Sequence, residues 1–353
     1  MSKYWSRAVH SCQPYTPGEQ PRGQSFIKLN TNENPYPPAP SVLKAIKEKS
    51  NDSLRLYPDP ECLELRQTIA EYYGLDVDAV FCGNGSDEVL AFAFQAFFDP
   101  GREILFPKIT YTFYPVYASL YNLDYHTVDM DENFNIQLEK LCSGEAGGII
   151  LANPNAPTGK FLPLSDIRQI IMANPQCVVI VDEAYIDFGG ESALKFIQEY
   201  PNLLVIQTFS KSRSLAGLRV GFACGHKDLI TALNRIKNSF NSYPLDRLAQ
   251  VGAIAAIKDQ AYFEETRQKV IKTRETVVPI LRRLGFRVID SLTNFVFISH
   301  NQVPAEELFQ RLREKGILVR HYSLPRINNY LRVTIGTETE MVQFCKALEE
   351  ILS

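Results

Sequence analysis

The chain of 353 residues lacks the features of several large protein classes. No apolar run approaches the roughly 18 residues that a membrane span needs. The start, Met1–Arg7, is not followed by the apolar stretch of a signal peptide. We therefore expect neither a membrane segment nor a secreted protein.

Clustered charge and clustered cysteine are also missing. No basic cluster interrupts the sequence and the formal net charge is −3, which argues against a nucleic-acid surface. The seven cysteines are scattered without a Cys-x-x-Cys pair, and the five histidines do not join them at ligand spacing. We expect free thiols in a cytoplasmic protein, no disulfide framework and no metal.

What is present suits two globular domains preceded by an arm, because 45% of the residues are hydrophobic and 22% are charged. Prolines in residues 1–40 disfavour regular helix or central strand there, so we expect an extended arm that packs against the rest of the protein. A flexible tail is the alternative. Two helical patterns follow, one from Ser41 with that serine as its cap and one over 62–73 that Gly74 closes.

Residues 41–240 alternate short apolar runs with helical patterns. This alternation predicts an α/β fold with a mostly parallel seven-stranded sheet covered on both faces. Ligands of such a sheet bind at the carboxyl ends of its strands. The predicted strands are Ala79–Cys82, Glu103–Phe106, Asp124–Val128, Gly148–Leu151, Cys177–Val181, Leu203–Thr208 and Val220–Cys224, and the predicted helices among them are Glu88–Phe98, Tyr111–Leu120, Leu164–Ala173 and Ser192–Glu199.

Residues 241–353 have a different pattern, which predicts a smaller α+β domain. A long helix over Tyr262–Leu284 precedes short strands that alternate with helices. The predicted elements after it are Phe286–Asp290, Asn294–Ile298, Pro304–Lys315, Ile317–Arg320, Leu331–Ile335 and Glu338–Leu352.

One lysine stands where a nucleophile would be useful. Lys211 comes soon after the apolar strand Leu203–Thr208, and a desolvated amine has a lowered pKa and a more nucleophilic nitrogen. Taken alone, a solvated lysine in a loop explains this position as well. Its neighbours along the sheet edge decide between the two.

Other strand ends carry matching chemistry. The turn from Gly83 to Glu88 joins a strand to a helix whose N-terminus could hold a phosphate, with Ser86 as cap, although a plain capped turn is the alternative. Asp182 ends the most apolar strand, either as a capping residue or as an anion held against a cationic ring nitrogen. The prolines and glycine of Asn153–Gly159 predict a rigid loop. Together with Arg219 and Lys211, these parts match what pyridoxal 5′-phosphate requires.

At this point the sequence resembles the fold-type-I pyridoxal-phosphate aminotransferases, which share the aspartate-aminotransferase-like fold, and more closely their histidinol-phosphate branch. The resemblance runs nearly end to end, from Pro14-Tyr15 through Leu29–Pro35 to Tyr330–Gly336. The spacings from Asp182 to Lys211 and from Lys211 to Arg219 are typical of this family.

The resemblance implies roles for individual residues. Lys211 would form the internal aldimine and then move a proton between the substrate Cα and the cofactor. Asp182 would keep the ring nitrogen protonated, and Tyr185 and Asn155 would contact the phenolate oxygen. The remaining cofactor contacts would come from Tyr111 on the ring face, from Gly85, Ser86, Asp87, Thr208, Ser210 and Arg219 at the phosphate, and from Tyr57 of a partner subunit in a homodimer.

The resemblance also implies a substrate site, with the arm of residues 1–40 packing at the active site and the small domain. Arg332 would take the α-carboxylate of glutamate, and with Arg320 and Tyr15 it would take the phosphate of histidinol phosphate, while Asn32 would line the pocket from the arm. One position departs from the family: the residue before Pro-Thr-Gly is Ala156, and Asn155 stands one position earlier.

The activity implied is a ping-pong transamination of L-histidinol phosphate and 2-oxoglutarate to imidazole-acetol phosphate and L-glutamate, a reaction of histidine biosynthesis. An aromatic amino-acid aminotransferase and a phosphothreonine decarboxylase on the same scaffold are the alternatives. The partners implied are an amino donor, a 2-oxo acid and a second copy of the chain.

Overall fold

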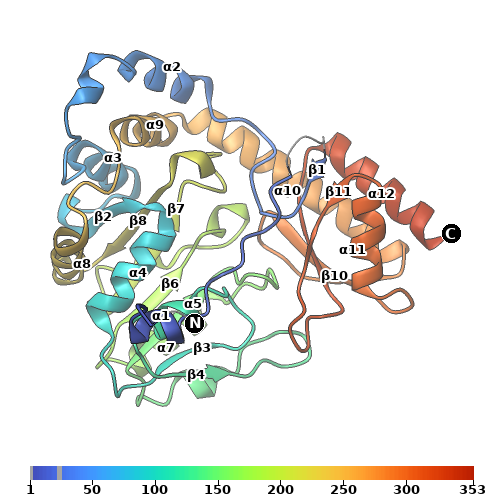
Figure 1. Cartoon of the computed structure of the whole chain (residues 1–353), viewed down its shortest axis with the longest axis horizontal. Helices are drawn as coiled ribbons and strands as arrows, with labels where there is room; N and C mark the ends of the chain where they lie inside the picture. Colours follow the sequence, from blue (N-terminus) through green and yellow to red (C-terminus); the bar gives the residue numbers. More distant parts are fainter. Residues whose placement is uncertain (1–2, 22–25) are drawn as a thin grey trace.

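The computed structural model describes residues 3–21 and 26–353, and its largest element is a seven-stranded sheet (Figure 1). The strand order is β2-β8-β7-β6-β5-β3-β4, and β8 runs antiparallel to both neighbours while the pairs from β7 to β4 are parallel. The mostly parallel sheet is therefore confirmed. Its strands are β2 (Val80–Asn84), β3 (Ile104–Pro107), β4 (Tyr125–Val128), β5 (Gly148–Ala152), β6 (Val179–Asp182), β7 (Leu203–Thr208) and β8 (Val220–Gly225).

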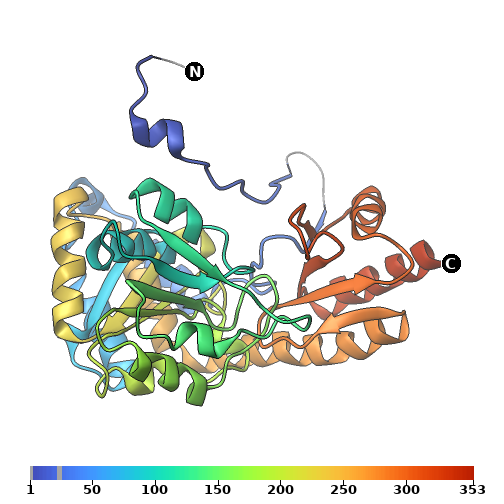
Figure 2. The ribbon, with the colours of Figure 1, turned by 90° about the horizontal axis from the view of Figure 1, so that it is seen from below.

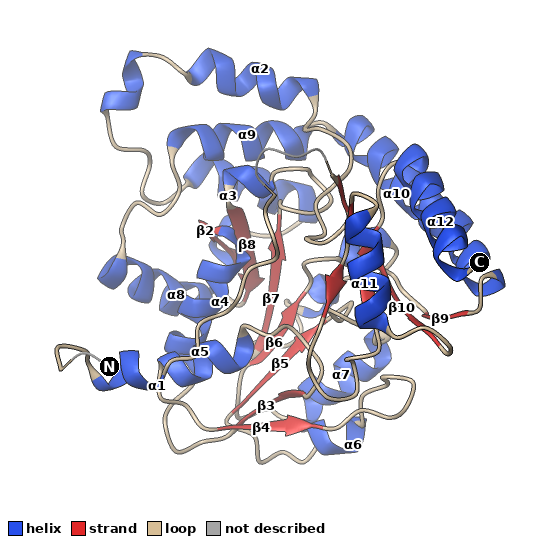
Figure 3. Ribbon diagram, turned by 45° about the vertical axis from the view of Figure 1, so that its right-hand side comes forward, coloured by secondary structure: helices blue, strands red, loops and turns tan. Residues whose placement is uncertain are grey.

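Both faces of this sheet are buried, which explains its continuous apolar strands. In β7, Leu203 and Val205 join one hydrophobic cluster, while Leu204 and Ile206 join another on the opposite face. Helices lie on both sides of the sheet (Figure 3) and supply the other side chains of each cluster. The first face packs on α3 (Leu63–Tyr73), α7 (Leu164–Ala173) and α9 (Arg247–Lys258), and the second on α4 (Gly85–Phe97), α5 (Tyr114–Leu120) and α8 (Lys227–Phe240).

A second core forms around the antiparallel sheet β12-β13-β10-β9. The long helix α10 (Gln260–Arg283) reaches it from the larger body, and α11 (Ala305–Glu314) and α12 (Glu338–Leu352) complete it (Figure 1). The strands are β9 (Phe286–Ile289), β10 (Phe295–His300), β12 (Arg320–His321) and β13 (Leu331–Thr334). The predicted strand 317–320 is two strands, because β11 (Ile317–Leu318) pairs with β1 (Ile27–Lys28) of the arm instead.

The arm runs across one side of the molecule from the larger body toward the smaller one (Figure 2). Its residues 1–2 and 22–25 lie outside the described part. The absence of regular helix was predicted too broadly, because α1 (Arg7–Ser11) forms before the first proline of the arm, Pro14. Further on, Tyr15 stacks on Phe113 with ring centroids 4.5 Å apart.

Several predicted caps and boundaries are corrected by the structure. Helix α2 (Pro40–Lys49) begins one residue before Ser41, whose hydroxyl donates to Asp259 rather than capping the helix. The segment 192–199 contains a short 3-10 helix, Ala193–Phe196. Gly74 does close α3 with a positive φ of 67°, as predicted.

The domain boundaries stay predictions. Helix α9 packs on the larger sheet although it lies in the predicted small domain, 241–353. Over residues 3–21 and 26–353, no helix has the length and apolar character for crossing a bilayer. The same residues hold no cluster of three or more metal-ligating side chains.

Candidate active site

A cavity of about 320 Å³ opens where the carboxyl ends of the parallel strands meet the arm and the smaller sheet. Its wall combines side chains that lie far apart in the sequence. Of the residues predicted for the site, those that line it are Tyr15, Asn32, Ser86, Asp87, Tyr111, Asp182, Tyr185, Thr208, Ser210, Lys211, Arg219, Arg320 and Arg332.

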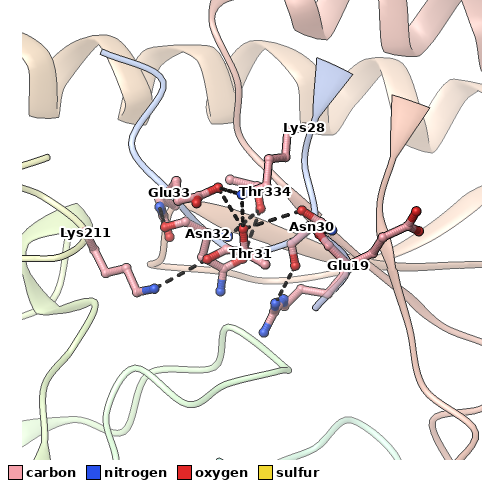
Figure 4. A network of polar contacts seen from close by, with 10 residues as sticks. Glu19, Lys28, Asn30, Thr31, Asn32, Glu33, Lys211 and Thr334 are labelled. Carbon is pink, nitrogen blue, oxygen red and sulfur yellow. Dashed lines mark hydrogen bonds and ion pairs between the residues drawn. The ribbon is translucent and has the colours of Figure 1, made fainter. Parts of the chain in front are cut away.

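Lys211 follows β7 and projects into this cavity. The side-chain amide of Asn34 donates to the carbonyls of Lys211 and Ser212 at 3.0 and 3.2 Å and fixes the backbone there. The Nζ atom donates to the carbonyl of Thr31 at 3.4 Å (Figure 4). Burial, followed by the positive charge of Arg332, lowers the pKa of Lys211 to about 8. A neutral, nucleophilic amine is therefore accessible near neutral pH.

Asp182 supplies the buried acid of the cavity. The hydroxyl of Tyr114 donates to its Oδ2 atom at 2.9 Å, and the N–H of Ala184 donates to its Oδ1 atom at 3.2 Å. Burial raises the pKa of Asp182 to about 6, against the opposing effect of these two donors. The carboxylate is therefore ionised at neutral pH and can pair with a cation inside the cavity.

The neighbouring acid, Glu183, does not line the cavity. Its carboxylate accepts from Ser192, from the N–H of Ala193 and from Gln207 at 2.5, 2.7 and 2.8 Å. Burial raises the pKa of Glu183 to about 7. Its contacts fix the loop that follows β6 rather than serve a ligand.

The turn between β2 and α4 forms a cradle for an anion. Helix α4 begins at Gly85, and its N-cap residue, Asn84, makes no side-chain capping bond, so Ser86 lies in the first turn rather than at the predicted cap. A Cβ atom on Gly221 of β8 would lie 2.3 Å from the amide nitrogen of Ser86. The two backbones approach each other closely here, and Ser86 and Asp87 of the first helical turn line the cavity, where a helix N-terminus can bind a phosphate.

Polar side chains surround this cradle. Thr208 and Ser210 are joined by a hydrogen bond of 3.0 Å. The carboxylate of Asp87 accepts from the hydroxyl of Tyr111 at 2.7 Å and from Arg219 at 3.1 Å. Gly85 has a positive φ of 81°, which favours glycine, and a Cβ atom there would lie 2.6 Å from the guanidinium of Arg219.

The opposite wall of the cavity carries two arginines. Arg320 and Arg332 are directly paired across β12 and β13. Arg332 donates to the carbonyl of Asn30 at 2.9 Å, while its buried Nε atom makes no hydrogen bond in the described chain. Arg320 donates to the carbonyl of Thr16 in the arm at 3.2 Å. Two adjacent guanidinium groups with donors to spare favour an anionic ligand group.

The arm closes the space between the two walls. Asn32 donates to the hydroxyl of Tyr185 at 2.9 Å, and its backbone N–H donates to Thr334 at 3.0 Å. Figure 4 shows Asn32, Thr31 and Glu33 in one polar network beside Lys211. Burial raises the pKa of Tyr185, so its hydroxyl keeps its proton at neutral pH.

Asn155 does not contact the cavity as expected. Its amide nitrogen donates to the carbonyl of Ile109 and to Thr158, both at 2.9 Å, and its oxygen accepts from Thr110 at 2.8 Å. Both ends of the amide are thus engaged in fixing the loop. Ala156 lines the cavity instead, so the departure from the family pattern leaves an apolar surface at this point.

Two other predicted residues do not line the cavity. Gly85 lies behind it at the start of α4. Tyr57 is 79% exposed and stacks on Tyr243, with ring centroids 4.6 Å apart. Its hydroxyl does not serve the cavity of its own chain.

The sequence did not predict several residues that shape the site. Tyr114 bonds Asp182, Asn34 holds the backbone of Lys211, and Thr31 accepts from its amine. Asn34 and Thr31 belong to the motif Leu29–Pro35, from which only Asn32 was selected. Tyr114 lies three residues after Tyr111, a spacing that places both on one side of a helical turn, and this was the available signal.

The arrangement fits pyridoxal 5′-phosphate. Gly221 approaches Ser86 so closely that no side chain fits between β8 and α4, and Ser86 lines the cavity in which a phosphate could lie. Asp182 offers an ionised carboxylate for a ring nitrogen, and Lys211 offers an amine for an aldehyde. All three border the same cavity.

Comparison with known proteins agrees with this geometry. Residues 24–348 match the family model described as aminotransferase class I and II. The histidinol-phosphate aminotransferase of Clostridium acetobutylicum is 56% identical over 353 residues, which is 100% of both chains.

Solved structures extend the comparison to the fold. The histidinol-phosphate aminotransferase of Sinorhizobium meliloti, in complex with pyridoxal-5′-phosphate, is 26% identical with a TM-score of 0.90, over 100% of this chain and 98% of that one. The aspartate aminotransferase of Thermus thermophilus with maleate has a TM-score of 0.84 at 19% identity, over 99% of each chain, and shares the fold. The predicted aspartate-aminotransferase-like fold is confirmed, and the chain belongs to the class I and II aminotransferases.

Proposed function

We propose that this chain is a pyridoxal-phosphate-dependent transaminase that transfers the amino group of L-histidinol phosphate to 2-oxoglutarate, giving imidazole-acetol phosphate and L-glutamate. The observation that carries the proposal is the single cavity that joins Lys211 to the paired Arg320 and Arg332. The 56% identity to a histidinol-phosphate aminotransferase over the whole chain supports this substrate over the alternatives.

Bound pyridoxal phosphate supplies an aldehyde for the amino group and a ring that accepts the electrons released at the substrate Cα. The chain orients this ring from both ends. The cradle of Ser86, Thr208 and Ser210 with Arg219 binds the phosphate. Asp182 would accept a hydrogen bond from the ring nitrogen and keep it protonated, with its carboxylate held in place by Tyr114. Tyr111 would cover the ring, and Tyr185 would donate to its phenolate oxygen.

Lys211 moves the proton. Lys211 would hold the cofactor through its aldehyde, and its Nζ atom would accept the proton of the substrate Cα when the substrate amine occupies that place. The lowered pKa, about 8, lets the nitrogen be neutral when it accepts this proton. Thr31 and Asn34 hold the residue where Nζ can face the substrate.

The arginine pair selects the substrate. Both substrates of the proposed reaction are anionic: histidinol phosphate carries a phosphate, and 2-oxoglutarate carries carboxylates, as does the product glutamate. Guanidinium groups bind both kinds of anion through forked hydrogen bonds. Tyr15 and Asn32 of the arm line the cavity that contains this pair.

The functional unit would be a homodimer in the cytoplasm, with Tyr57 reaching the cofactor phosphate of the partner subunit. Its exposure, and the exposed apolar residues beside it in the sequence, support this proposal. Leu54 and Leu56 are each 51% exposed, and Tyr243, which stacks on Tyr57, is 42% exposed. Contiguous exposed apolar side chains mark an interface.

A coupled assay over three substrates tests the proposed specificity. We expect histidinol phosphate to give the highest kcat/KM with 2-oxoglutarate as acceptor, well above phenylalanine. Phosphothreonine should give no carbon dioxide. Preference for phenylalanine would indicate an aromatic aminotransferase, and release of carbon dioxide from phosphothreonine would indicate a decarboxylase.

A further inference from the structure

Lys237 is a buried cation outside the active site. It lies on α8 with 2% of its surface exposed. Its Nζ atom donates to the carbonyl of Pro60 at 2.7 Å and lies 3.3 Å from a carboxylate oxygen of Glu61. Because an unpaired buried ammonium is costly, Lys237 favours the one arrangement of residues 60–61 that satisfies it.

The backbone that Lys237 holds is a loop without helix or strand, and two further side chains hold it as well. Arg247 donates to the carbonyl of Tyr57 at 2.9 Å, and Gln250 donates to the carbonyl of Asp59 at 3.2 Å. Lys237 completes the series at Pro60. Three of the four carbonyls from 57 to 60 are therefore fixed by side chains of α8 and α9, which lie beside this loop (Figure 1).

The loop fixed in this way carries Tyr57, whose side chain is exposed to solvent in the single chain. Tyr57 is 79% exposed, and its ring lies against Tyr243 at an interplanar angle of 23°. Tyr243 belongs to the connection between α8 and α9, where the carbonyl of Pro244 accepts from Asn84 at 3.0 Å. The loop, the ring and their support thus form one fixed unit at the surface.

We propose that Lys237 is a positioning residue for the phosphate site of a second copy of this chain, acting through the backbone of residues 57–60 and the ring of Tyr57. The inference rests on the proposed homodimer. Loss of the Lys237 contacts would free the loop and weaken cofactor binding in the neighbouring subunit, while the cavity that belongs to the altered chain keeps its own cradle.

Heterodimers with two affinity tags separate these subunits. The first pairs a wild-type chain with a chain that carries both Lys211→Ala and Lys237→Met. The competent cavity, which is the one that retains Lys211, then faces the altered loop of its partner. The other combines Lys211→Ala with Lys237→Met, so that the competent cavity faces an intact loop. We expect the dissociation constant of lysine-linked pyridoxal phosphate to rise about tenfold in the first alone, within the range of a lost hydrogen bond to a charged group.

Matched variants complete the test. Lys227→Met removes an exposed lysine from the same helix and should change nothing. If Lys237→Met does not fold, Arg247→Met takes its place, because the Arg247 side chain is partly exposed and donates to the Tyr57 carbonyl. Its loss should raise the dissociation constant in the same arrangement. Lys237→Arg should restore part of the affinity.

The outcomes distinguish this inference from the proposed dimer. The positioning role would be overturned if the dissociation constant of the cofactor rose equally in both heterodimers, or only where the chain with the competent cavity itself carries Lys237→Met. The positioning role would also be overturned if Lys237→Met changed cofactor affinity in neither heterodimer while Tyr57→Phe, in the chain opposite the competent cavity, weakened binding. In that case the dimer proposal would stand. If Tyr57→Phe has no effect in that arrangement, both proposals fail.

Discussion

At the scale of single residues, the reactivity of Lys211 follows from an environment that disfavours its protonated form. The amine lies in a cavity that already contains Arg332, and burial together with this neighbour disfavours the ammonium form. Asp87 and Glu33 act in the opposite direction through their negative charges. The balance leaves the pKa at about 8, between an ordinary lysine and a fully desolvated one.

The first prediction concerns capture of the cofactor by protein from which it has been removed. Because only neutral Nζ reacts with an aldehyde, the capture rate should rise with pH and level off above about 8. Near pH 7 it should exceed that of a lysine of ordinary pKa by roughly two orders of magnitude. Stopped-flow absorbance measures this rate, and Lys211→Ala should show no capture. A midpoint near pH 10 would contradict the argument.

A second prediction tests how Tyr114 controls Asp182. The hydroxyl of Tyr114 favours the charged carboxylate, so Tyr114→Phe should raise the pKa of Asp182 above about 6. On acidification, cofactor affinity should therefore begin to fall at a pH about one unit higher than in the wild-type protein. Equilibrium dialysis across pH 5–8 measures this shift. Tyr121→Phe, at the end of the same helix, is the control; the same acid limb in both variants would remove the role of Tyr114.

At the scale of elements, the sequence predicted the larger sheet well because its strands are buried on both faces. Each then appears as a short apolar run between polar turns, and the run Leu203–Thr208 coincides with β7. Strand ends were also predictable, since Asp182 directly follows one such run and Lys211 comes soon after another. The carboxyl edge of the sheet, and hence half of the cavity, could be located this way.

The rest depended on partners distant in sequence. Ser41 and Ser86 have the residue type of a cap, but Ser41 bonds Asp259 and Ser86 lies inside α4, because tertiary contacts decide where these helices begin. Asn155 was expected at a ligand, yet its amide holds the loop to Ile109 and Thr110. Strand β1 was not predicted because its partner, β11, follows almost 300 residues later.

The close packing of β8 on the first turn of α4 gives a third prediction. In Gly221→Ala the new methyl group would lie 2.3 Å from the amide nitrogen of Ser86, so the cradle must shift. Such overpacking costs about 1–3 kcal/mol, and cofactor affinity should fall at least about tenfold. Gly217→Ala is the matched control, since its methyl group would meet nothing within 4 Å. Equal affinity and equal thermal stability in the two variants would show that the cradle is not rigid.

At the scale of the whole molecule, the cavity exists only where three parts of the chain meet. The larger sheet contributes Lys211 and Asp182, the smaller sheet contributes the paired arginines, and the arm contributes Asn32 and Tyr15. The arm joins the smaller sheet's region through β1 and β11, and Glu19 forms an ion pair with Arg313 of α11 at 2.8 Å. The residues proposed for the chemistry and those proposed for substrate selection therefore come from different parts of the chain that line one cavity.

The last prediction is that activity depends on association of two copies. The exposed apolar residues around Tyr57 would be buried in the proposed dimer, and a charge placed there would have to be desolvated. Leu56→Asp should therefore shift the protein toward monomer in sedimentation at micromolar concentration and should reduce kcat/KM by more than about tenfold. Met172→Asp changes a residue of similar exposure, 62%, on α7 and should leave both measurements unchanged. Since the monomer would keep Lys211, Asp182 and the arginine pair, full activity in a monomeric Leu56→Asp protein would show that one chain suffices and that Tyr57 serves no neighbouring site.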